Sequence, residues 1–218
     1  MKLRGQYHIP HNAIITVAGT VGVGKSTMVQ ALAEALDFRT SYEKVDQNPY
    51  LGRFYEDFEK WSFHLQIYFL AERFKEQKRM FEYGGGFVQD RSIYEDTGIF
   101  AKMHMENGTM NPVDYATYTS LFEAMVMTPY FTHPDLLIYL EGPLDVILER
   151  IRERGRPMEQ QTPISYWEEM YGRYTEWMES FNACPVLRIN VSNYDLLEKP
   201  EEIEMIVERI GSIMEHVR

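Results

Sequence analysis

The stretch from Gly19 to Thr27 is the first pattern in the sequence with a chemical meaning. It follows a short apolar run, fits Gly-x-x-x-x-Gly-Lys-Ser/Thr and opens a helical pattern. Glycines let backbone N–H groups close around phosphate oxygens, and a helix N-terminus adds partial positive charge. Lys25 can reach the β- and γ-phosphates of a nucleoside triphosphate, while the Ser26 hydroxyl can ligate Mg²⁺. We therefore expect a triphosphate site, a P-loop, at Gly19, Thr20, Val21, Gly22, Val23, Gly24, Lys25, Ser26 and Thr27.

A P-loop alone does not distinguish a GTPase from an ATPase or a small-molecule kinase. The sequence contains no Asn-Lys-x-Asp motif for reading guanine and no Asp-x-x-Gly switch motif, which disfavours a signalling GTPase. A glycine-rich turn that binds nothing is a weak alternative, because a predicted strand precedes the motif and a predicted helix follows it.

Asp90 and Arg91 form the second candidate phosphate site. They follow an apolar run, and open α/β sheets bind ligands at the carboxyl ends of their strands. Asp90 could hold Mg²⁺ directly or through water, and Arg91 could fix a phosphoryl group during transfer. A solvated ion pair is the structural alternative for these two residues, but their position after a buried strand favours the functional interpretation.

Arginines occupy every second position from Arg150 to Arg156, where a helical pattern runs into a Gly-Arg-Pro break. Spacing by two residues spreads side chains around a helix, so these four cannot form one ion-pair stripe. Arginines at a helix–loop junction can close over a triphosphate and exclude water. We expect a lid at about residues 152–162, with Arg152, Arg154 and Arg156 on the phosphates. A charged helix end stabilised by its dipole is the alternative for Arg150 and Arg152.

Alternating strands and helices are expected to position these groups. Short apolar or β-branched runs alternate with helical patterns, as in parallel βαβ units, and predict an α/β fold with a five-stranded parallel sheet. The predicted strands are Ala13–Ala18, Thr40–Tyr42, Gly86–Gln89, Leu136–Leu140 and Val186–Asn190. The predicted helices are Lys25–Leu36, Trp61–Met80, Ile93–Glu106, Val113–Met127, Leu144–Arg154, Tyr166–Phe181 and Pro200–Val217.

Length and charge limit the possible functions. A chain of 218 residues without repeats or linkers predicts a single domain over residues 1–218. Its net charge of −11 argues against binding to a nucleic-acid backbone. No apolar run approaches the ~20 residues that a membrane span needs, and the first ten residues do not match a secretory signal, so a cytoplasmic location is expected. The one cysteine, Cys184, is expected to be an inert thiol.

Beyond these motifs, the chain resembles the deoxynucleoside kinases, and among them the bacterial kinases of deoxyadenosine and deoxycytidine. The resemblance covers nearly the whole chain and includes the P-loop and Asp90-Arg91-Ser92. It also includes Tyr42-Glu43 with Asp46-x-Asn48-Pro49-Tyr50, the spacing of Tyr55, Trp61 and Gln66, and the arginine lid followed by Glu159. The resemblance implies a P-loop kinase fold and ATP-dependent phosphorylation of a deoxynucleoside in nucleotide salvage.

The resemblance also implies roles for individual residues. Glu43 would be the general base that takes the proton from the nucleoside 5′-hydroxyl, and Arg91 would contact both that oxygen and the phosphoryl group. Tyr55 and Glu159 would bind the sugar 3′-hydroxyl. The catalytic set implied is Glu43, Arg91 and Lys25, with Ser26 and Asp90 on Mg²⁺.

Base recognition is implied at the other end of the site. The Gln66 amide would pair with the edge of adenine or cytosine, since it both donates and accepts in one plane. Phe100 would stack on the base. Arg73 and Asp96 match the ion pair that purine- and deoxycytidine-accepting members carry beneath the base. Each of these residues has packing as its alternative.

The sequence departs from the family pattern at two places. Asp90 stands where animal members place glutamate, which leaves open whether it ligates metal or orients another group. Lys44 replaces a proline after Glu43. Family members are commonly homodimers, and the Met-rich helix Tyr115–Met127 could serve as an interface or as core.

The expected function is therefore 5′-phosphorylation of a deoxynucleoside by ATP with Mg²⁺. Deoxyadenosine and deoxycytidine are favoured by Gln66, and deoxyguanosine remains possible. One alternative is a nucleoside monophosphate kinase of the thymidylate kinase type, which would need further cations on its acceptor side. Another is a regulatory ATP-binding protein without kinase activity, whose slow hydrolysis would be indifferent to nucleosides.

Overall fold

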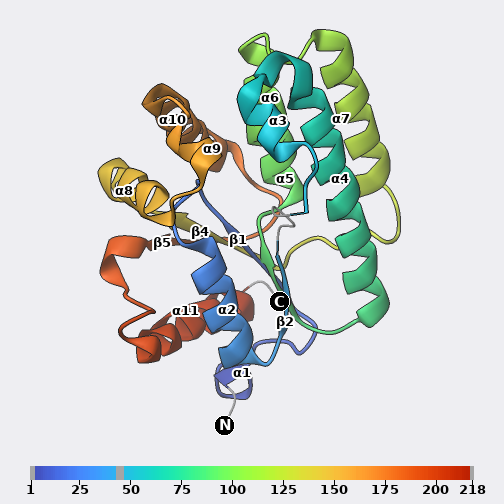
Figure 1. The fold of residues 1–218 in the computed structure, drawn as a ribbon. Coiled ribbons are helices and arrows are strands. Elements are labelled where there is room, and N and C mark those ends of the chain that lie inside the picture. The colour runs from blue at the N-terminus through green and yellow to red at the C-terminus, as the bar shows by residue number, and fades with distance from the viewer. Residues whose placement is uncertain (1–2, 43–46, 217–218) are drawn as a thin grey trace.

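Five parallel strands form the centre of the computed structural model, which describes residues 3–42 and 47–216 (Figure 1). The strand order across the sheet is β2-β3-β1-β4-β5. The strands are β1 (Ile14–Ala18), β2 (Arg39–Ser41), β3 (Phe87–Asp90), β4 (Leu136–Glu141) and β5 (Val186–Asn190). The predicted five-stranded parallel sheet is confirmed within these ranges, with each predicted strand displaced by no more than a residue or two at its ends.

The central strand β1 shows why this sheet lies inside the molecule. All five of its residues are buried, as expected for a parallel strand covered by helices on both faces. Ile15 is paired with Val88 of β3 on one side and with Leu136 of β4 on the other. This register brings the end of β1 and the end of β3 to the same edge of the sheet, where the P-loop and Asp90-Arg91 follow.

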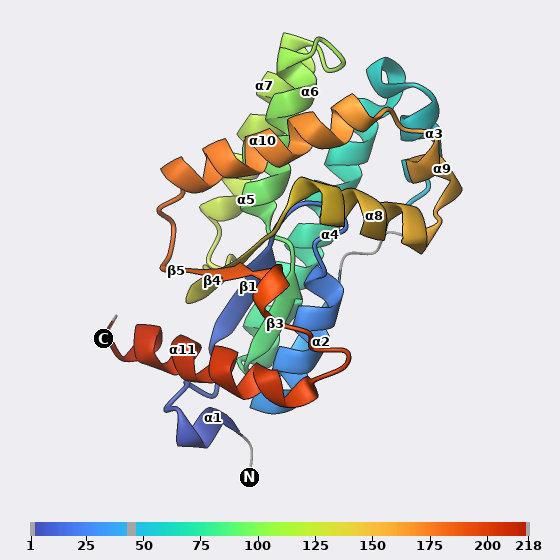
Figure 2. The ribbon, with the colours of Figure 1, turned by 90° about the vertical axis from the view of Figure 1, so that its left-hand side faces the viewer.

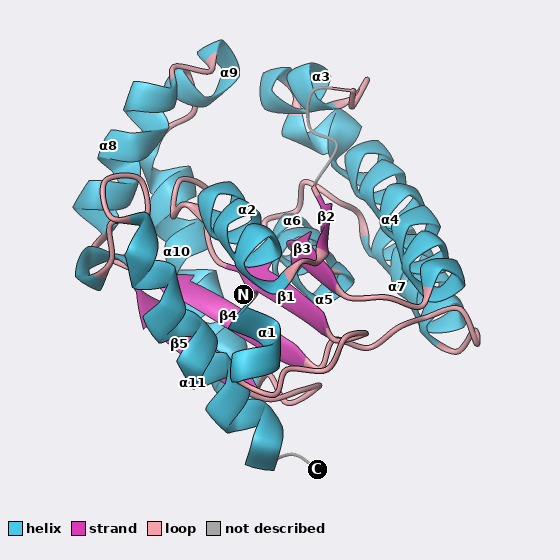
Figure 3. Ribbon diagram, turned by 90° about the horizontal axis from the view of Figure 1, so that it is seen from below, coloured by secondary structure: helices cyan, strands magenta, loops and turns pink. Residues whose placement is uncertain are grey.

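Two layers of helices enclose the sheet, as Figures 2 and 3 show. The layer with the N- and C-terminal helices contains α1 (Leu3–Gln6), α2 (Lys25–Leu36) and α11 (Ile203–His216). The opposite layer contains α4 (Phe58–Tyr83), α5 (Ile93–Glu95), the π-helix η1 (Asp96–Ala101), α6 (Lys102–Glu106), α7 (Pro112–Val126) and α10 (Ile164–Ser180). The largest apolar cluster packs between the layers and joins all strands but β2 to α2, α10 and α11.

Shorter elements surround the carboxyl edge of the sheet. These are α3 (Leu51–Glu56), α8 (Leu144–Arg154) and α9 (Pro157–Gln160). Two 3₁₀ turns, η2 (Val191–Asn193) and η3 (Pro200–Glu202), lie between β5 and α11. None of the helices in the described ranges combines the length and apolar character that crossing a bilayer requires.

The structure corrects two of the predicted helices and adds three short ones. The predicted helix Ile93–Glu106 is three consecutive segments, because Asp96–Ala101 forms a π-helix that interrupts the α-helical ladder. The last helix begins at Ile203, after a 3₁₀ turn at Pro200, because proline fixes the first turn but cannot donate a backbone hydrogen bond. Helices α1, α3 and α9 were not predicted.

Candidate active site

A cavity of about 380 Å³ lies at the carboxyl edge of the sheet. The P-loop contributes Gly24, Lys25 and Ser26 to its wall, and the loop after β3 contributes Asp90 and Arg91. The rest of the wall includes Tyr55, Gln66, Phe69, Asp96, Phe100, Arg154, Arg156, Glu159, Tyr166 and Met170. One cavity thus joins the predicted phosphate site to most of the predicted nucleoside site.

The P-loop has the backbone shape that its glycines predict. Gly22 and Gly24 have φ angles of 84° and 102°, which side-chain-bearing residues rarely adopt. Gly22 also lies against α8, since an added Cβ would stand 2.9 Å from the Ile147 carbonyl oxygen. Lys25 is the first residue of α2, and its Nζ donates to the carbonyl oxygens of Gly19 at 2.7 Å and Thr20 at 2.9 Å. Lys25 is thereby held along the inner side of the loop.

Ser26 and Asp90 meet at the predicted metal position. The Ser26 hydroxyl donates to Asp90 Oδ2 at 2.9 Å, while Asp90 Oδ1 is buried without a hydrogen-bond partner in the described part of the chain. Oxygen donors of this kind suit Mg²⁺, which usually takes only one or two protein ligands beside phosphate oxygens and water. No three His, Cys, Asp or Glu side chains within residues 3–42 and 47–216 cluster into a larger metal site. The residues present therefore fit magnesium held jointly with a nucleotide.

Arg91 is buried and backbone-strained. Its φ is 67°, in the left-handed region that is costly for a residue with a side chain and is concentrated at functional sites. Its N–H donates to the Val17 carbonyl oxygen at 2.9 Å, which ties this turn to β1. The guanidinium carbon lies 4.8 Å from the centre of the Phe100 ring. Arg91 therefore has a fixed position between the sheet edge and the nucleoside end of the cavity.

Glu95 belongs to this region, although it lies in no motif of the kinds described above. It is fully buried, and its carboxylate accepts hydrogen bonds from the Gly19 N–H, the Ser92 N–H and the Tyr174 hydroxyl. Burial raises the pKa of the Glu95 carboxyl, because it disfavours the charged form, while the nearby Arg91 and Lys25 charges act in the opposite direction. A buried acid adjoining the P-loop is a functional candidate.

The nucleoside end of the cavity contains a buried amide. Gln66, on α4, is 2% exposed, and its Oε1 has no hydrogen-bond partner among the described residues. Beside it, the predicted ion pair is present, with Arg73 Nε 2.9 Å from Asp96 Oδ2. Arg73 also donates to the Asp90 carbonyl oxygen at 3.0 Å, which links the ion pair to the end of β3. Phe100 follows Asp96 by one turn of the π-helix, and both side chains face the cavity.

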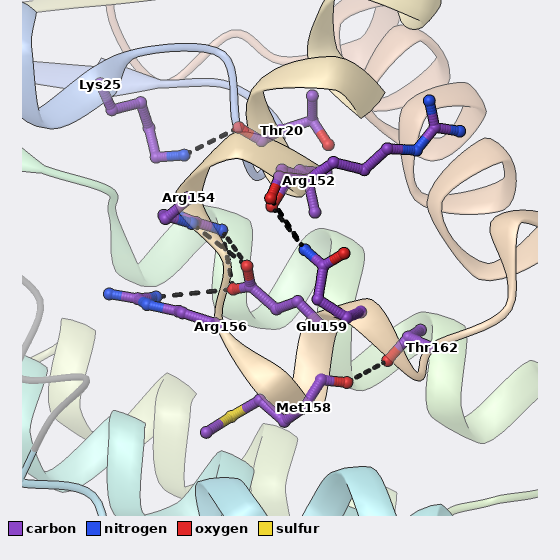
Figure 4. A network of polar contacts seen from close by, with 10 residues as sticks. Thr20, Lys25, Arg152, Arg154, Arg156, Met158, Glu159 and Thr162 are labelled. Carbon is purple, nitrogen blue, oxygen red and sulfur yellow. Dashed lines mark hydrogen bonds and ion pairs between the residues drawn. The ribbon is translucent and has the colours of Figure 1, made fainter.

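Two of the lid arginines, Arg154 and Arg156, converge on Glu159, as Figure 4 shows. Arg154 donates to both carboxylate oxygens of Glu159, and Arg156 lies 3.5 Å from Oε1. Arg152 extends away from this cluster in Figure 4 and does not line the cavity. Its assignment to ATP is therefore unsupported, because residues two apart on α8 point in different directions. Arg150 lines the cavity instead, and its Nη1 donates to the Val23 carbonyl oxygen at 3.2 Å.

Some of the predicted site residues lie outside the described part of the chain or away from this cavity. Glu43, the predicted base, lies outside the described residues, whereas its neighbour Tyr42 lines the cavity. Gly19, Thr20 and Val23 do not line that cavity. Val23 lines a second cavity of about 990 Å³ between the P-loop, Arg150 and residues 191–199. Of the residues that sequence reasoning missed, Arg150 belongs to the alternating arginine run, but Glu95 and Tyr166 carry no motif.

Several known proteins are similar to this chain over most of its length. The chain is 69% identical over 209 residues to the deoxyadenosine/deoxycytidine kinase of Bacillus subtilis, with 96% of each chain covered. It is 38% identical to a deoxyadenosine kinase of Dictyostelium discoideum over 194 residues, which is 88% of this chain and 77% of that protein.

A solved structure also matches. The deoxyadenosine kinase from M. mycoides, with the products dCMP and a flexible dCDP bound, superposes with a TM-score of 0.76 at 29% identity and covers 90% of this chain and 99% of its own. The sequence model of the deoxynucleoside kinase family matches residues 15–215. A match over nearly the whole chain, together with a relative at 69% identity, shows that the protein belongs to the deoxynucleoside kinase family.

Proposed function

We propose that the protein transfers the γ-phosphoryl group of ATP to the 5′-hydroxyl of a deoxyribonucleoside, in nucleotide salvage. The observation that carries the proposal is the single cavity lined at one end by Lys25 and Ser26 and at the other by Gln66 and Phe100. A triphosphate and a nucleoside bound there would meet beside Arg91. Phosphoryl transfer depends mainly on such positioning and on charge stabilisation.

Deoxyadenosine and deoxycytidine are the proposed acceptors, with deoxyguanosine possible. The buried Gln66 amide offers the adjacent donor and acceptor that adenine and cytosine edges require. The relative in Bacillus subtilis is named for these same two nucleosides, and structures of the M. mycoides enzyme hold dCTP or dATP. The proposed sugar contacts are Tyr55 and Glu159, which both line the cavity.

In the proposed mechanism, Glu43 takes the 5′-hydroxyl proton as the oxygen attacks the γ-phosphorus in line, while the bond from that phosphorus to the β,γ-bridging oxygen breaks and ADP leaves. Lys25 and Arg91 stabilise the charge that develops on the transferred group, and Arg154 and Arg156 add charge from the lid. Ser26 and Asp90 would hold magnesium, which would supply positive charge to neutralise the phosphates. We propose that the second cavity, bordered by residues 191–199, receives the adenine of ATP.

A coupled assay of ADP release tests this function. The panel consists of the four deoxynucleosides, their ribose counterparts and the corresponding deoxynucleoside monophosphates, each with ATP and Mg²⁺. We expect the highest kcat/KM with deoxyadenosine or deoxycytidine. Faster ADP release with monophosphates would favour the thymidylate kinase type, and ADP release independent of every acceptor would favour a regulatory ATP-binding protein.

Three wider properties belong to the same proposal. We place residues 1–218 in one kinase domain, located in the cytoplasm where ATP and nucleosides are available. We also propose a homodimer. Its support is the exposed apolar surface of α7 and its neighbours, where Val113 and Leu121 are 75% and 41% exposed. Light scattering of the unmodified protein and of Leu121→Lys tests the dimer, which should be lost in the variant.

A further inference from the structure

A buried hydrogen-bond network connects the two halves of the candidate active site. Glu95 Oε1 accepts from the Gly19 N–H at 3.3 Å and from the Tyr174 hydroxyl at 2.8 Å. Arg91 Nη1 donates to the same Tyr174 hydroxyl at 2.7 Å. The chain of contacts therefore runs from the first residue of the P-loop, through Glu95 and Tyr174, to the arginine that faces the nucleoside.

The direction of each hydrogen bond follows from the groups involved. A guanidinium only donates, so the Tyr174 hydroxyl accepts from Arg91 and has its single proton left for Glu95. The Tyr174 ring cannot move easily to break this arrangement, because it is fully buried and packs against Tyr139 and Phe100. The position of the Arg91 guanidinium is thus defined by Tyr174 on one side and the Phe100 ring on the other.

A purely local role for Glu95 leaves half of its carboxylate unexplained. Glu95 and Ser92 form a capping box that begins α5, in which Oε2 accepts from the Ser92 N–H at 2.8 Å. That box needs only one carboxylate oxygen. The other oxygen, Oε1, contacts two segments far away in sequence, one in the P-loop and one on α10. Burying a carboxylate is costly unless it is well paired. The burial of Glu95, with Oε1 bonded to the P-loop and to α10, therefore indicates a function beyond the helix cap.

We propose that Glu95 and Tyr174 are positioning residues for phosphoryl transfer: together they orient the Arg91 guanidinium and fix it relative to the start of the P-loop. This inference rests on the proposed kinase function. Its consequence is that the acceptor side and the donor side of the reaction share one rigid support. A small displacement of a catalytic group lowers kcat more than it weakens substrate binding, because alignment of the reacting groups matters most in the transition state.

Tyr174→Phe is the first test, since it removes one hydroxyl and keeps the ring. We expect kcat to fall about tenfold or more, while KM for the deoxynucleoside stays within about twofold, because a hydrogen bond to a charged group is lost without a change in shape. Tyr171→Phe is the matched control, as Tyr171 lies on the same helix and donates to the Gly142 carbonyl oxygen instead. The control should keep the kcat of the unmodified protein.

A double variant separates positioning of Arg91 from general stability. If Tyr174 acts through Arg91, then adding Tyr174→Phe to Arg91→Lys should lower kcat little further, since the oriented guanidinium is already absent. If Tyr174 were merely structural, Tyr174→Phe would instead lower the Tm, and it would lower kcat by the same factor in the unmodified protein and in Arg91→Lys. An equal fold-loss of kcat in both proteins, or an unchanged kcat in Tyr174→Phe alone, overturns the inference.

Glu95→Gln tests the acid itself. The amide keeps the length of the side chain but has one accepting oxygen, so we expect a loss of kcat at least as large as in Tyr174→Phe and a raised KM for ATP. If this variant does not fold, Tyr174→Phe still decides. The unmodified protein keeps the two proposals apart: without nucleoside-dependent ADP release, the proposed function fails and the positioning role fails with it. An active unmodified protein with a fully active Tyr174→Phe variant removes the positioning role alone.

Discussion

Arg154 and Glu159 form an ion pair in which the Arg154 Nη2 atom lies 2.7 Å from each carboxylate oxygen of Glu159. Arg154 is a proposed phosphate ligand and Glu159 a proposed ligand of the sugar 3′-hydroxyl. Glu159 is 5% exposed, so its charge interacts with little competition from water. One carboxylate therefore connects the lid and the proposed sugar site, and a substitution at Glu159 should alter the binding of both ATP and the nucleoside.

Glu159→Gln should impair recognition of the sugar more than recognition of ATP. The neutral amide makes a weaker hydrogen bond to a hydroxyl than a carboxylate does, so we expect KM for deoxyadenosine to rise about tenfold or more. Discrimination against 2′,3′-dideoxyadenosine should shrink for the same reason. Steady-state kinetics with both nucleosides measures this. Glu149→Gln, at an exposed position of the neighbouring α8, is the matched control, and equal kinetics for the two variants would contradict the assignment.

Glu43→Gln should separate ATP binding from turnover. If Glu43 is the general base, the amide cannot take the 5′-hydroxyl proton, and kcat should fall by about a few hundredfold, within the ~10²–10⁴ that acid–base groups contribute. The increase of Tm on adding ATP with Mg²⁺ should persist. Glu34→Gln, on the exposed side of α2, provides the comparison. Near-normal turnover in Glu43→Gln would remove Glu43 from the mechanism.

Gln66→Leu should weaken base recognition without harming the fold. The leucine has a similar volume and removes a buried carbonyl oxygen that has no partner in the described part of the chain, so the Tm should stay the same or rise. We expect kcat/KM for both deoxyadenosine and deoxycytidine to fall by about tenfold to a hundredfold, as a lost pair of hydrogen bonds predicts. Thermal unfolding and steady-state kinetics measure the two effects. A stable variant with unchanged kcat/KM would show that Gln66 is packing.

Strong local signals explain which elements the sequence predicts well. The predicted bounds of α2 and α8 agree with the structure, because Gly24 precedes the first helix and Gly155, with φ of 68°, ends the second. Helices α1, α3 and α9 have six residues or fewer and so contain too few turns for an apolar period to show. The π-helix at Asp96–Ala101 depends on how this segment packs against α4 and α10, which local pattern does not encode.

In the candidate site, too, residues in local motifs are predicted and residues brought together by packing are not. Motif and strand position predict the P-loop and Asp90-Arg91, because each lies in a short, patterned segment, whereas the Arg73–Asp96 ion pair is implied by the resemblance to the family. Glu95 and Tyr174 are 79 positions apart, and only the packing of α10 against η1 brings them together. Arg152 and Arg150 show a third case, in which the motif identifies the arginine run but the rotation of α8 decides which members face the cavity.

His104 should make the stability of the protein fall in mild acid. Burial lowers the pKa of His104 to about 4, from an ordinary value of 6.5. The unfolded chain therefore binds a proton at this residue as the pH falls through 6.5, whereas the folded protein binds it only near pH 4. The stability contribution is therefore complete above pH 6.5 and is lost as the pH falls, by about 2 kcal/mol between pH 7 and pH 5. His104→Gln, which stays neutral and can still bond to Thr109, should flatten this part of the profile in urea unfolding, whereas the exposed His11→Gln should not. An unchanged slope in His104→Gln would show that His104 takes up its proton equally in the folded and unfolded states.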